Sequence, residues 1–134
     1  MPAFSFFSPA ILVMGISMSQ SKTYEYLPIQ TTEQCEVNIS QLHNKGFVSG
    51  GYSVCLDTGF PIQANSNYSQ GENTRVPYWL IAAINNDYEY MAMNDKAHCQ
   101  ANLDKLVSQR FVSTGLFSST PYAVCIATGF PSLK

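Results

Sequence analysis

An internal duplication restricts the fold of this chain more than any other feature of its sequence. Residues 24–26 (Tyr-Glu-Tyr) recur 64 positions later as residues 88–90. At the same spacing three further pairs recur in order: Cys35 and Cys99, Asn38 and Asn102, and Leu42 and Leu106. Residues 52–61 resemble residues 122–131, 70 positions later, so the second copy carries a six-residue insertion. Such self-similarity predicts two copies of one supersecondary unit.

Each copy has the pattern of a strand, a helix and a second strand. The first strand is short, Tyr-rich and alternating in polarity. The helix follows an N-cap residue and repeats its apolar residues at helical spacing. The second strand stops at the tetrapeptide Thr-Gly-Phe-Pro, because glycine and proline end strand pairing. The predicted elements are strands at 23–30 and 87–93, helices at 32–45 and 95–109, and strands at 52–58 and 122–128.

Two β-α-β copies in series predict an α+β fold. Their order, βαββαβ, is that of the ferredoxin-like fold, in which two helices cover one face of an antiparallel sheet. The repeats extend over residues 22–61 and 86–131. Residues 62–75 are polar and predict an exposed linker, and residues 76–84 predict an extra strand. We therefore expect residues 20–134 to form a single disulfide-stabilised domain.

The chain has four cysteines: Cys35, Cys55, Cys99 and Cys125. The repeat favours one pairing, with one disulfide inside each copy. In a β-α-β unit the helix runs antiparallel to the strand that follows. Rises of about 1.5 Å per helical residue and about 3.3 Å per strand residue then bring the two cysteines of a copy side by side. No Cys-x-x-Cys motif is present, so we expect structural disulfides rather than a redox or zinc site.

Residues 1–19 differ from the rest of the chain in being apolar and free of charged side chains. Their length, and the small residues Ser17 and Ser19 before Gln20, predict a signal peptide. An uncleaved membrane anchor and an ordinary N-terminal strand or arm are the alternatives. Together with an even number of cysteines, a signal peptide predicts a secreted, periplasmic or cell-envelope protein. We expect no membrane span beyond this segment.

Side-chain parity predicts a tyrosine-rich face on the sheet. Side chains alternate along a strand, so the neighbours of a helix-facing cysteine point away from the helix. The face without helices would then carry six tyrosines: Tyr24, Tyr26, Tyr52, Tyr88, Tyr90 and Tyr122. Tyrosine suits contact surfaces because it joins a large apolar area to a polar tip. Internal cover by another segment, homodimerisation and ligand binding are the three interpretations of this face.

Few residues have the pattern of a catalytic or ligand site. Trp79 is interpreted either as a core residue that anchors the extra strand or as a stacking residue for a sugar or peptide. His43 and His98 belong to no Ser-His-Asp arrangement. Asp57, which the pattern places beside a disulfide, has Ala127 as its counterpart. We therefore expect no catalytic residue, no cofactor and no metal.

Charge and composition argue against nucleic acid as a partner. The net charge is −2 and only 12% of the residues are charged, so no basic surface is available for phosphates. Asn38 and Asn67 both begin a triplet that fits N-glycosylation. The first lies in a predicted helix, which favours a chance match, and the second lies in the polar linker.

The layout of two β-α-β copies, with Leu-containing helices that end before a glycine, resembles that of SPOR domains, which bind bacterial cell-wall glycan. The resemblance is one of layout, and it assigns no role to individual residues. We expect a small exported, non-enzymatic structural or interaction protein that presents its tyrosine-rich face to a protein partner or to a second subunit. A glycan- or peptide-binding module of the cell envelope, using the same face with Trp79, is the alternative.

Overall fold

The computed structural model describes residues 3–4, 8–18, 21–46, 53–61, 75–84, 87–109, 111–112 and 122–132. The strands within these ranges are β1 (Ala3–Phe4), β2 (Ala10–Met18), β3 (Ser21–Ile29), β4 (Ser53–Asp57), β5 (Tyr78–Ile84), β6 (Asp87–Met93) and β7 (Ala123–Ala127). The helices are α1 (Thr32–Asn44) and α2 (Lys96–Ser108). Residues 62–74 of the predicted linker lie outside the described ranges, and the predicted extra strand is β5.

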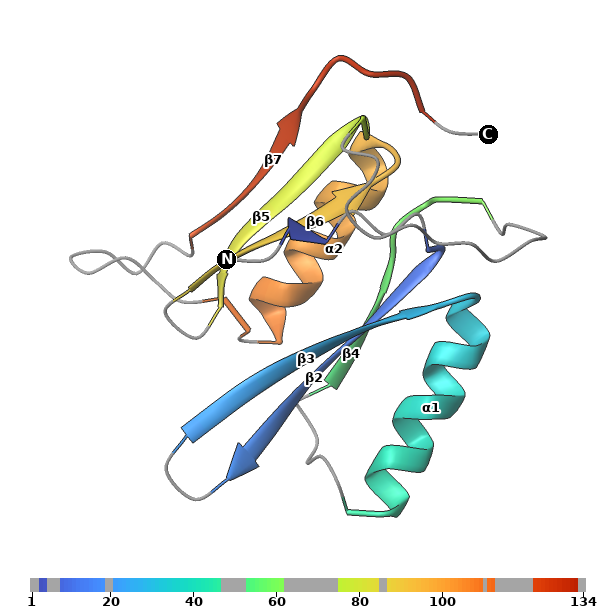
Figure 1. The fold of residues 1–134 in the computed structure, drawn as a ribbon, viewed down its shortest axis with the longest axis vertical. Helices are drawn as coiled ribbons and strands as arrows, with labels where there is room; N and C mark the ends of the chain where they lie inside the picture. The colour runs from blue at the N-terminus through green and yellow to red at the C-terminus, as the bar shows by residue number, and fades with distance from the viewer. Residues whose placement is uncertain are drawn as a thin grey trace.

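Each repeat is a β-hairpin followed by a helix and a third strand (Figure 1). In the first repeat the sheet order is β3-β2-β4, with antiparallel neighbours throughout. In the second repeat the order is β6-β5-β7, and the short β1 pairs in parallel with β6. The strands before and after each helix are therefore not neighbours. They run parallel to each other, and the first hairpin strand, β2 or β5, lies between them and pairs with both.

The two repeats form two separate sheets. The predicted single βαββαβ sheet with both helices on one face is not observed, and the prediction is correct only at the level of an α+β fold with antiparallel strands, two helices and two disulfides. The physical reason lies in β2 and β5. Each supplies its repeat with a third strand, so each repeat completes its own sheet and stacks on the other repeat instead of sharing strands with it.

The segment for which the sequence predicts a signal peptide contributes β2, whose first four residues are buried. In both sheets an equivalent threonine hydroxyl bonds to the proline that lies near the start of the central strand. The Thr58 hydroxyl donates to the Pro9 carbonyl at 3.1 Å. The Thr128 hydroxyl makes the matching bond to the Pro77 carbonyl at 3.0 Å. Cleavage after Ser19, as a signal peptide would require, would therefore remove the central strand of the first sheet.

Both helices begin at side-chain caps and are bonded to the strand that follows them. Thr31 and Asp95 are the N-caps, and each side chain accepts a hydrogen bond from the backbone amide three residues later. The disulfides are those predicted: Cys35–Cys55 and Cys99–Cys125, with Cα separations of 6.0 and 6.1 Å. Each disulfide joins a helix to the third strand of the same repeat.

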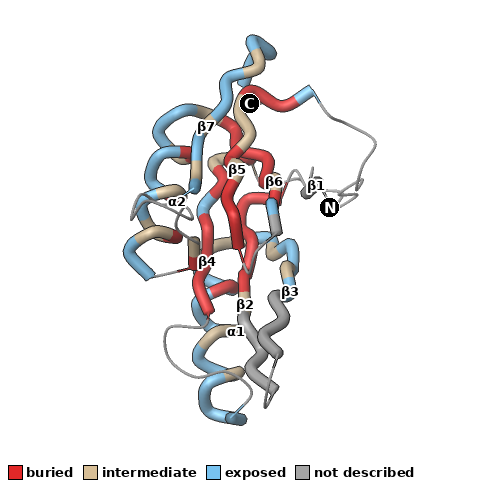
Figure 2. The backbone as a smooth tube through the Cα atoms, turned by 90° about the vertical axis from the view of Figure 1, so that its left-hand side faces the viewer, coloured by how far each residue is buried: buried red, intermediate tan, exposed pale blue. Residues whose placement is uncertain are grey.

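The layers stack in the order second sheet, α2, first sheet, α1 (Figure 1). Ala10 and Leu12 of β2 pack with α1 around the first disulfide. Ile11 and Val13 point the other way and join a cluster with α2 and the helix side of the second sheet. Burial is therefore concentrated in β2, β4, β5 and β6, whereas β7 is only partly buried or exposed (Figure 2).

Candidate interaction surface

The junction between the repeats buries part of one face of the first sheet. We call it the junction face; its residues are Ile11 and Val13 of β2 and Val54 and Leu56 of β4. Each of these side chains is at most 1% exposed. They pack against a surface of the second repeat that includes Leu80, Ala82, Met91 and Leu106. The junction is thus a protein–protein contact formed within one chain.

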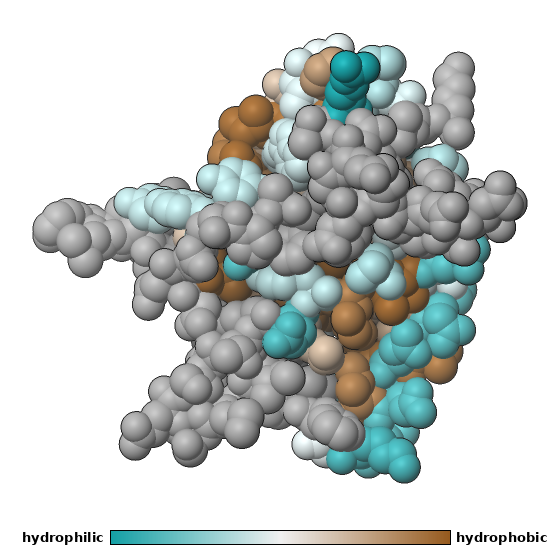
Figure 3. Space-filling view, in the orientation of Figure 1, coloured by the Kyte–Doolittle hydropathy of each residue, from teal (hydrophilic) through white to brown (hydrophobic). Residues whose placement is uncertain are grey.

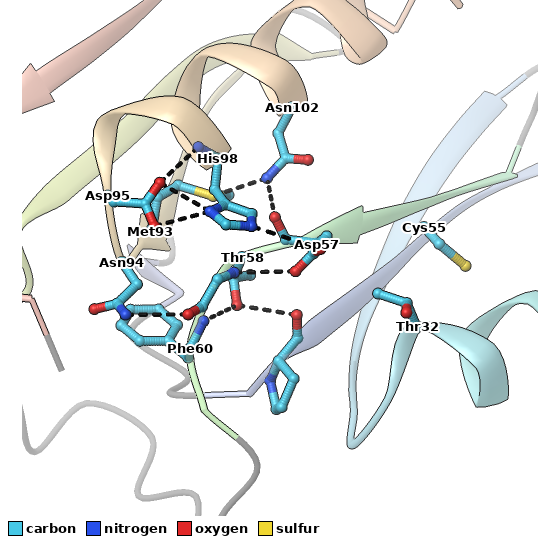
Figure 4. Close-up of polar contacts among 12 residues, drawn as sticks. Thr32, Cys55, Asp57, Thr58, Phe60, Met93, Asn94, Asp95, His98 and Asn102 are labelled. Carbon is cyan, nitrogen blue, oxygen red and sulfur yellow. Dashed lines mark hydrogen bonds and ion pairs between the residues drawn. The ribbon is translucent and has the colours of Figure 1, made fainter. Parts of the chain in front are cut away.

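Two side chains of α2 bond to the outer edge of β4. In the pairing of β2 with β4, the carbonyls of Cys55 and Asp57 point away from β2. Asn102 Nδ2 donates to the Asp57 carbonyl at 2.8 Å (Figure 4). The Lys105 ammonium donates to the Cys55 carbonyl at 2.6 Å. The second repeat thereby satisfies an edge that would otherwise be open to water or to another strand.

A turn of the first repeat fits closely against the start of α2 (Figure 4). Gly59 has a φ of +82°, and a Cβ added there would lie 2.6 Å from His98 Nδ1. The same nitrogen is 2.8 Å from the Asp95 carboxylate, and His98 Nε2 is 3.6 Å from the Asp57 carboxylate. Asn94 Nδ2 donates to the Gly59 carbonyl at 3.0 Å. A close glycine contact and charge-assisted contacts therefore fix the register of the junction.

Contacts at the start of α2 change the pKa of one carboxyl group. Burial by itself would raise the pKa of Asp95. Hydrogen bonds from the backbone amide and ring of His98, the coulombic attraction of His98 and the Ala97 amide outweigh burial and lower the pKa of Asp95 below its ordinary 3.8. The Asp57 side chain is 57% exposed. Of these contacts, the one between His98 and Asp57 joins the start of α2 to the end of β4.

The second repeat presents the matching face to solvent. Strand pairing aligns the two sheets residue by residue. Ala10 pairs with Ile29 and with Asp57 in the first sheet, and its counterpart Tyr78 pairs with Met93 and with Ala127 in the second. The junction face then corresponds to Trp79, Ile81, Val124 and Ile126. Val124 and Ile126 are 47% and 42% exposed, and Figure 3 shows hydrophobic surface near β7. We call these four residues, together with Tyr88, Tyr90 and Tyr122, the open face.

Three tyrosines of the predicted face belong to the open face: Tyr88, Tyr90 and Tyr122. Tyr88 and Tyr122 line a shallow pocket together with Ile81 and Val124. Tyr26, the counterpart of Tyr90, packs against the core at the junction instead. The side chain of Tyr24 and the whole of Tyr52 lie outside the described residues. Tyr26 is separated from the three tyrosines of the second repeat because the sheets are stacked and the junction covers this part of the first sheet.

Trp79 is partly buried at one end of the open face. It packs against a cluster of Phe60, Val76 and Ala92. Phe60 comes from the first repeat, so Trp79 contacts both repeats. This position agrees with the interpretation of Trp79 as an anchor for the extra strand.

Local sequence patterns predicted a strand within residues 1–19 only as an alternative, and they did not match Ile81 to that segment. The signal that identifies them is a proline before each apolar run: Pro9 and Pro77 are 68 positions apart. The counterpart of Phe60 is Phe130, which is 45% exposed. The phenylalanine of the Thr-Gly-Phe-Pro motif is therefore buried against the second repeat in the first copy of the motif and exposed in the second copy.

Within the described ranges, no group of three or more His, Cys, Asp and Glu side chains could hold a metal ion. Over the same ranges, no helix has the length and apolar character needed to cross a membrane. No protein-family model, curated protein or solved structure matches the chain. The geometry of the junction and of the open face is therefore the basis for a functional proposal.

Proposed function

We propose that the protein is a small exported, non-enzymatic structural or interaction protein that binds a protein partner through its open face. One observation carries this proposal: the face that is buried by protein in the first repeat is largely exposed along β7 in the second. Val54 and Val124 give the clearest comparison, because the residue type is the same and only the exposed fraction differs, at 1% and 47%. A face with this shape already packs against protein once in the molecule.

The side chains of the open face support a protein contact. Val124 and Ile126 are each more than 40% exposed, and Tyr88 and Tyr122 line a pocket with Val124. Contiguous apolar patches on soluble proteins usually mark contact surfaces. Aromatic residues are also enriched where proteins bind one another, whereas charged residues are depleted there. The open face has both properties.

The two disulfides support an oxidising location. Disulfides persist in secreted, periplasmic and envelope proteins and are rare where thiols are kept reduced. Each one here joins a helix to an adjacent strand and leaves no free cysteine among the described residues. We therefore place the protein outside the cytosol as part of the proposal.

Site-specific photo-crosslinking tests the proposed function. Tyr122→p-benzoylphenylalanine in the full chain, expressed in its source cells, should give protein adducts on irradiation. Val37 is the matched control, because it is 59% exposed on α1 and its counterpart Ala101 is exposed in the second repeat. The absence of adducts from position 122, or the same adducts from both positions, would contradict the proposal. A saturable change in Trp79 fluorescence with cell-wall saccharide, without protein adducts, would favour the glycan-binding alternative.

A further inference from the structure

The first repeat has a groove at the position equivalent to the surface of the second repeat that packs against the junction face. It has a volume of about 430 Å³ and lies between α1, β2 and β3, where Figure 3 shows a second hydrophobic area. Its lining residues are Leu12, Met14, Leu27, Asn38, Gln41, Leu42 and Lys45. Leu27 is 43% exposed. We call it the α1 groove.

The α1 groove is the counterpart of the surface that binds the junction face. Strand and helix register relates its apolar residues to buried ones in the second repeat: Leu12 to Leu80, Met14 to Ala82, Leu27 to Met91, and Leu42 to Leu106. In the second repeat all four counterparts are fully buried beneath the junction face. The described residues therefore form one filled pair of matching surfaces, the junction. They also form one unfilled pair, the open face and the α1 groove.

The polar contacts of the junction have counterparts as well. Asn102 corresponds to Asn38, and Lys105 corresponds to Gln41. The Asn38 side chain accepts from Gln34 through its oxygen, which leaves its NH2 group for a further acceptor. Gln41 is exposed and also has an NH2 group to donate.

The acceptors lie on the edge of β7. Backbone bonds from Ala83 to Tyr122 and from Thr128 to Pro77 fix the parity of the β5–β7 pairing. This parity directs the carbonyls of Cys125 and Ala127 away from β5, like those of Cys55 and Asp57 in β4.

We infer that the partner of the open face is a second copy of this chain, which receives it in its α1 groove and so repeats the internal junction between molecules. Asn38 and Gln41 of one copy donate to the carbonyls of Ala127 and Cys125 of the other. The contact joins unlike surfaces, so it is heterologous, and every added copy leaves one open face and one α1 groove unused. Contacts of this kind build open chains rather than closed dimers. The inference rests on the proposed function, because it names the partner of that face.

Sedimentation velocity of the full, disulfide-bonded chain over a range of concentrations tests this inference. The average mass of the wild-type protein should rise beyond that of a dimer. Ile126→Asp damages the open face and Leu27→Asp damages the α1 groove, and each should weaken association at least ~30-fold, as expected for a residue at the centre of an interface. Gln41→Glu is a second groove variant at an exposed helix position. Val37→Asp is the control and should associate as the wild type does.

Mixing the variants separates a head-to-tail contact from other arrangements. An equimolar mixture of Ile126→Asp and Leu27→Asp should form a dimer and stop there, because each variant keeps one intact surface. Circular dichroism and a free-thiol assay verify that each variant is folded.

A wild-type protein that stays monomeric at up to about millimolar concentration would overturn the inference. Unchanged association of both groove variants would also overturn it. If Ile126→Asp alone blocks association, the faces pair with each other, and the proposed function survives without the inference. If the wild type is monomeric and position 122 crosslinks a different protein, the proposed function again survives alone. If the wild type is monomeric and position 122 crosslinks no protein, both the inference and the proposed function are wrong.

Discussion

At the scale of single residues, the junction depends on a turn that only glycine fits. Gly59 and Gly129 hold equivalent places in the two Thr-Gly-Phe-Pro motifs and have φ values of +82° and +91°. Only Gly59 has a neighbour, since an added Cβ would meet the His98 ring there and nothing within 4 Å at Gly129. Sequence shows the repeated glycine, but the contact with His98 joins residues far apart in the chain and could not be predicted from local pattern.

Gly59→Ala is expected to lower the free energy of unfolding more than Gly129→Ala does. Both substitutions place a side chain at positive φ, which costs roughly 1–2 kcal/mol. At position 59 the added carbon must also displace His98, for a total of about 2–4 kcal/mol. Urea denaturation of the disulfide-bonded proteins measures both values. Equal losses for the two variants would show that the turn is not pressed against α2.

The lowered pKa of Asp95 predicts a loss of stability in acid. Because its pKa is lower in the folded protein, the unfolded chain takes up the proton first as the pH falls. The stabilising contribution is therefore present above the ordinary value of 3.8 and is lost as the pH falls through that value toward the folded pKa. Asp95→Asn keeps the helix cap but removes the titration. Between about pH 5 and about pH 3, the wild type should lose more stability than Asp95→Asn, and parallel curves would contradict this account.

At the scale of elements, the helices, their caps and both disulfides could be predicted because their signals lie close together in sequence. β2 could not be assigned in the same way. Ala10 and Leu12 are buried against α1, whereas Ile11 and Val13 are buried at the junction. A strand buried on both faces shows no alternation of polar and apolar residues, so it looks like the apolar region of a signal peptide. The sheet order then follows from pairs that no local pattern specifies.

Removal of residues 1–19 is expected to abolish cooperative folding. β3 and β4 do not pair with each other, and each is held in the sheet by β2. The truncated chain would also expose the side of Val54 and Leu56 that β2 helps to cover. Circular dichroism during heating, compared with the full chain, makes the measurement. A truncated protein that unfolds cooperatively and keeps both disulfides would show that β2 is dispensable, and the full chain would then be compatible with cleavage after Ser19.

At the scale of the whole molecule, two similar units stack with unlike ends. One unit contributes the junction face and the other covers it, so the stack has an open face at one end and an α1 groove at the other. Stacked repeats normally need terminal units with polar outer surfaces to stay soluble as single molecules. The exposed Val124 and Ile126 do not fit that role, which is why we assign the open face to a partner.

Substitution of two equivalent valines compares how strongly the junction face and the open face are buried. Val54→Asp places a carboxylate in the junction, where burial without a partner is expected to cost at least ~3 kcal/mol of unfolding free energy. Val124→Asp places the same group on the open face, where the cost is expected to be below ~1 kcal/mol. Chemical denaturation of dilute protein compares them. Similar losses for both variants would mean that the two faces have the same surroundings.

The most direct test of the account is hydroxyl-radical footprinting of dilute, disulfide-bonded protein with residue-level mass spectrometry. Leu56 and Phe60 are 0% and 4% exposed, and their counterparts Ile126 and Phe130 are 42% and 45% exposed. We predict that oxidation of Ile126 and Phe130 greatly exceeds that of Leu56 and Phe60 in the same molecules. Equal oxidation of the matched residues would contradict the claim that the second repeat covers the junction face of the first while its own open face stays exposed.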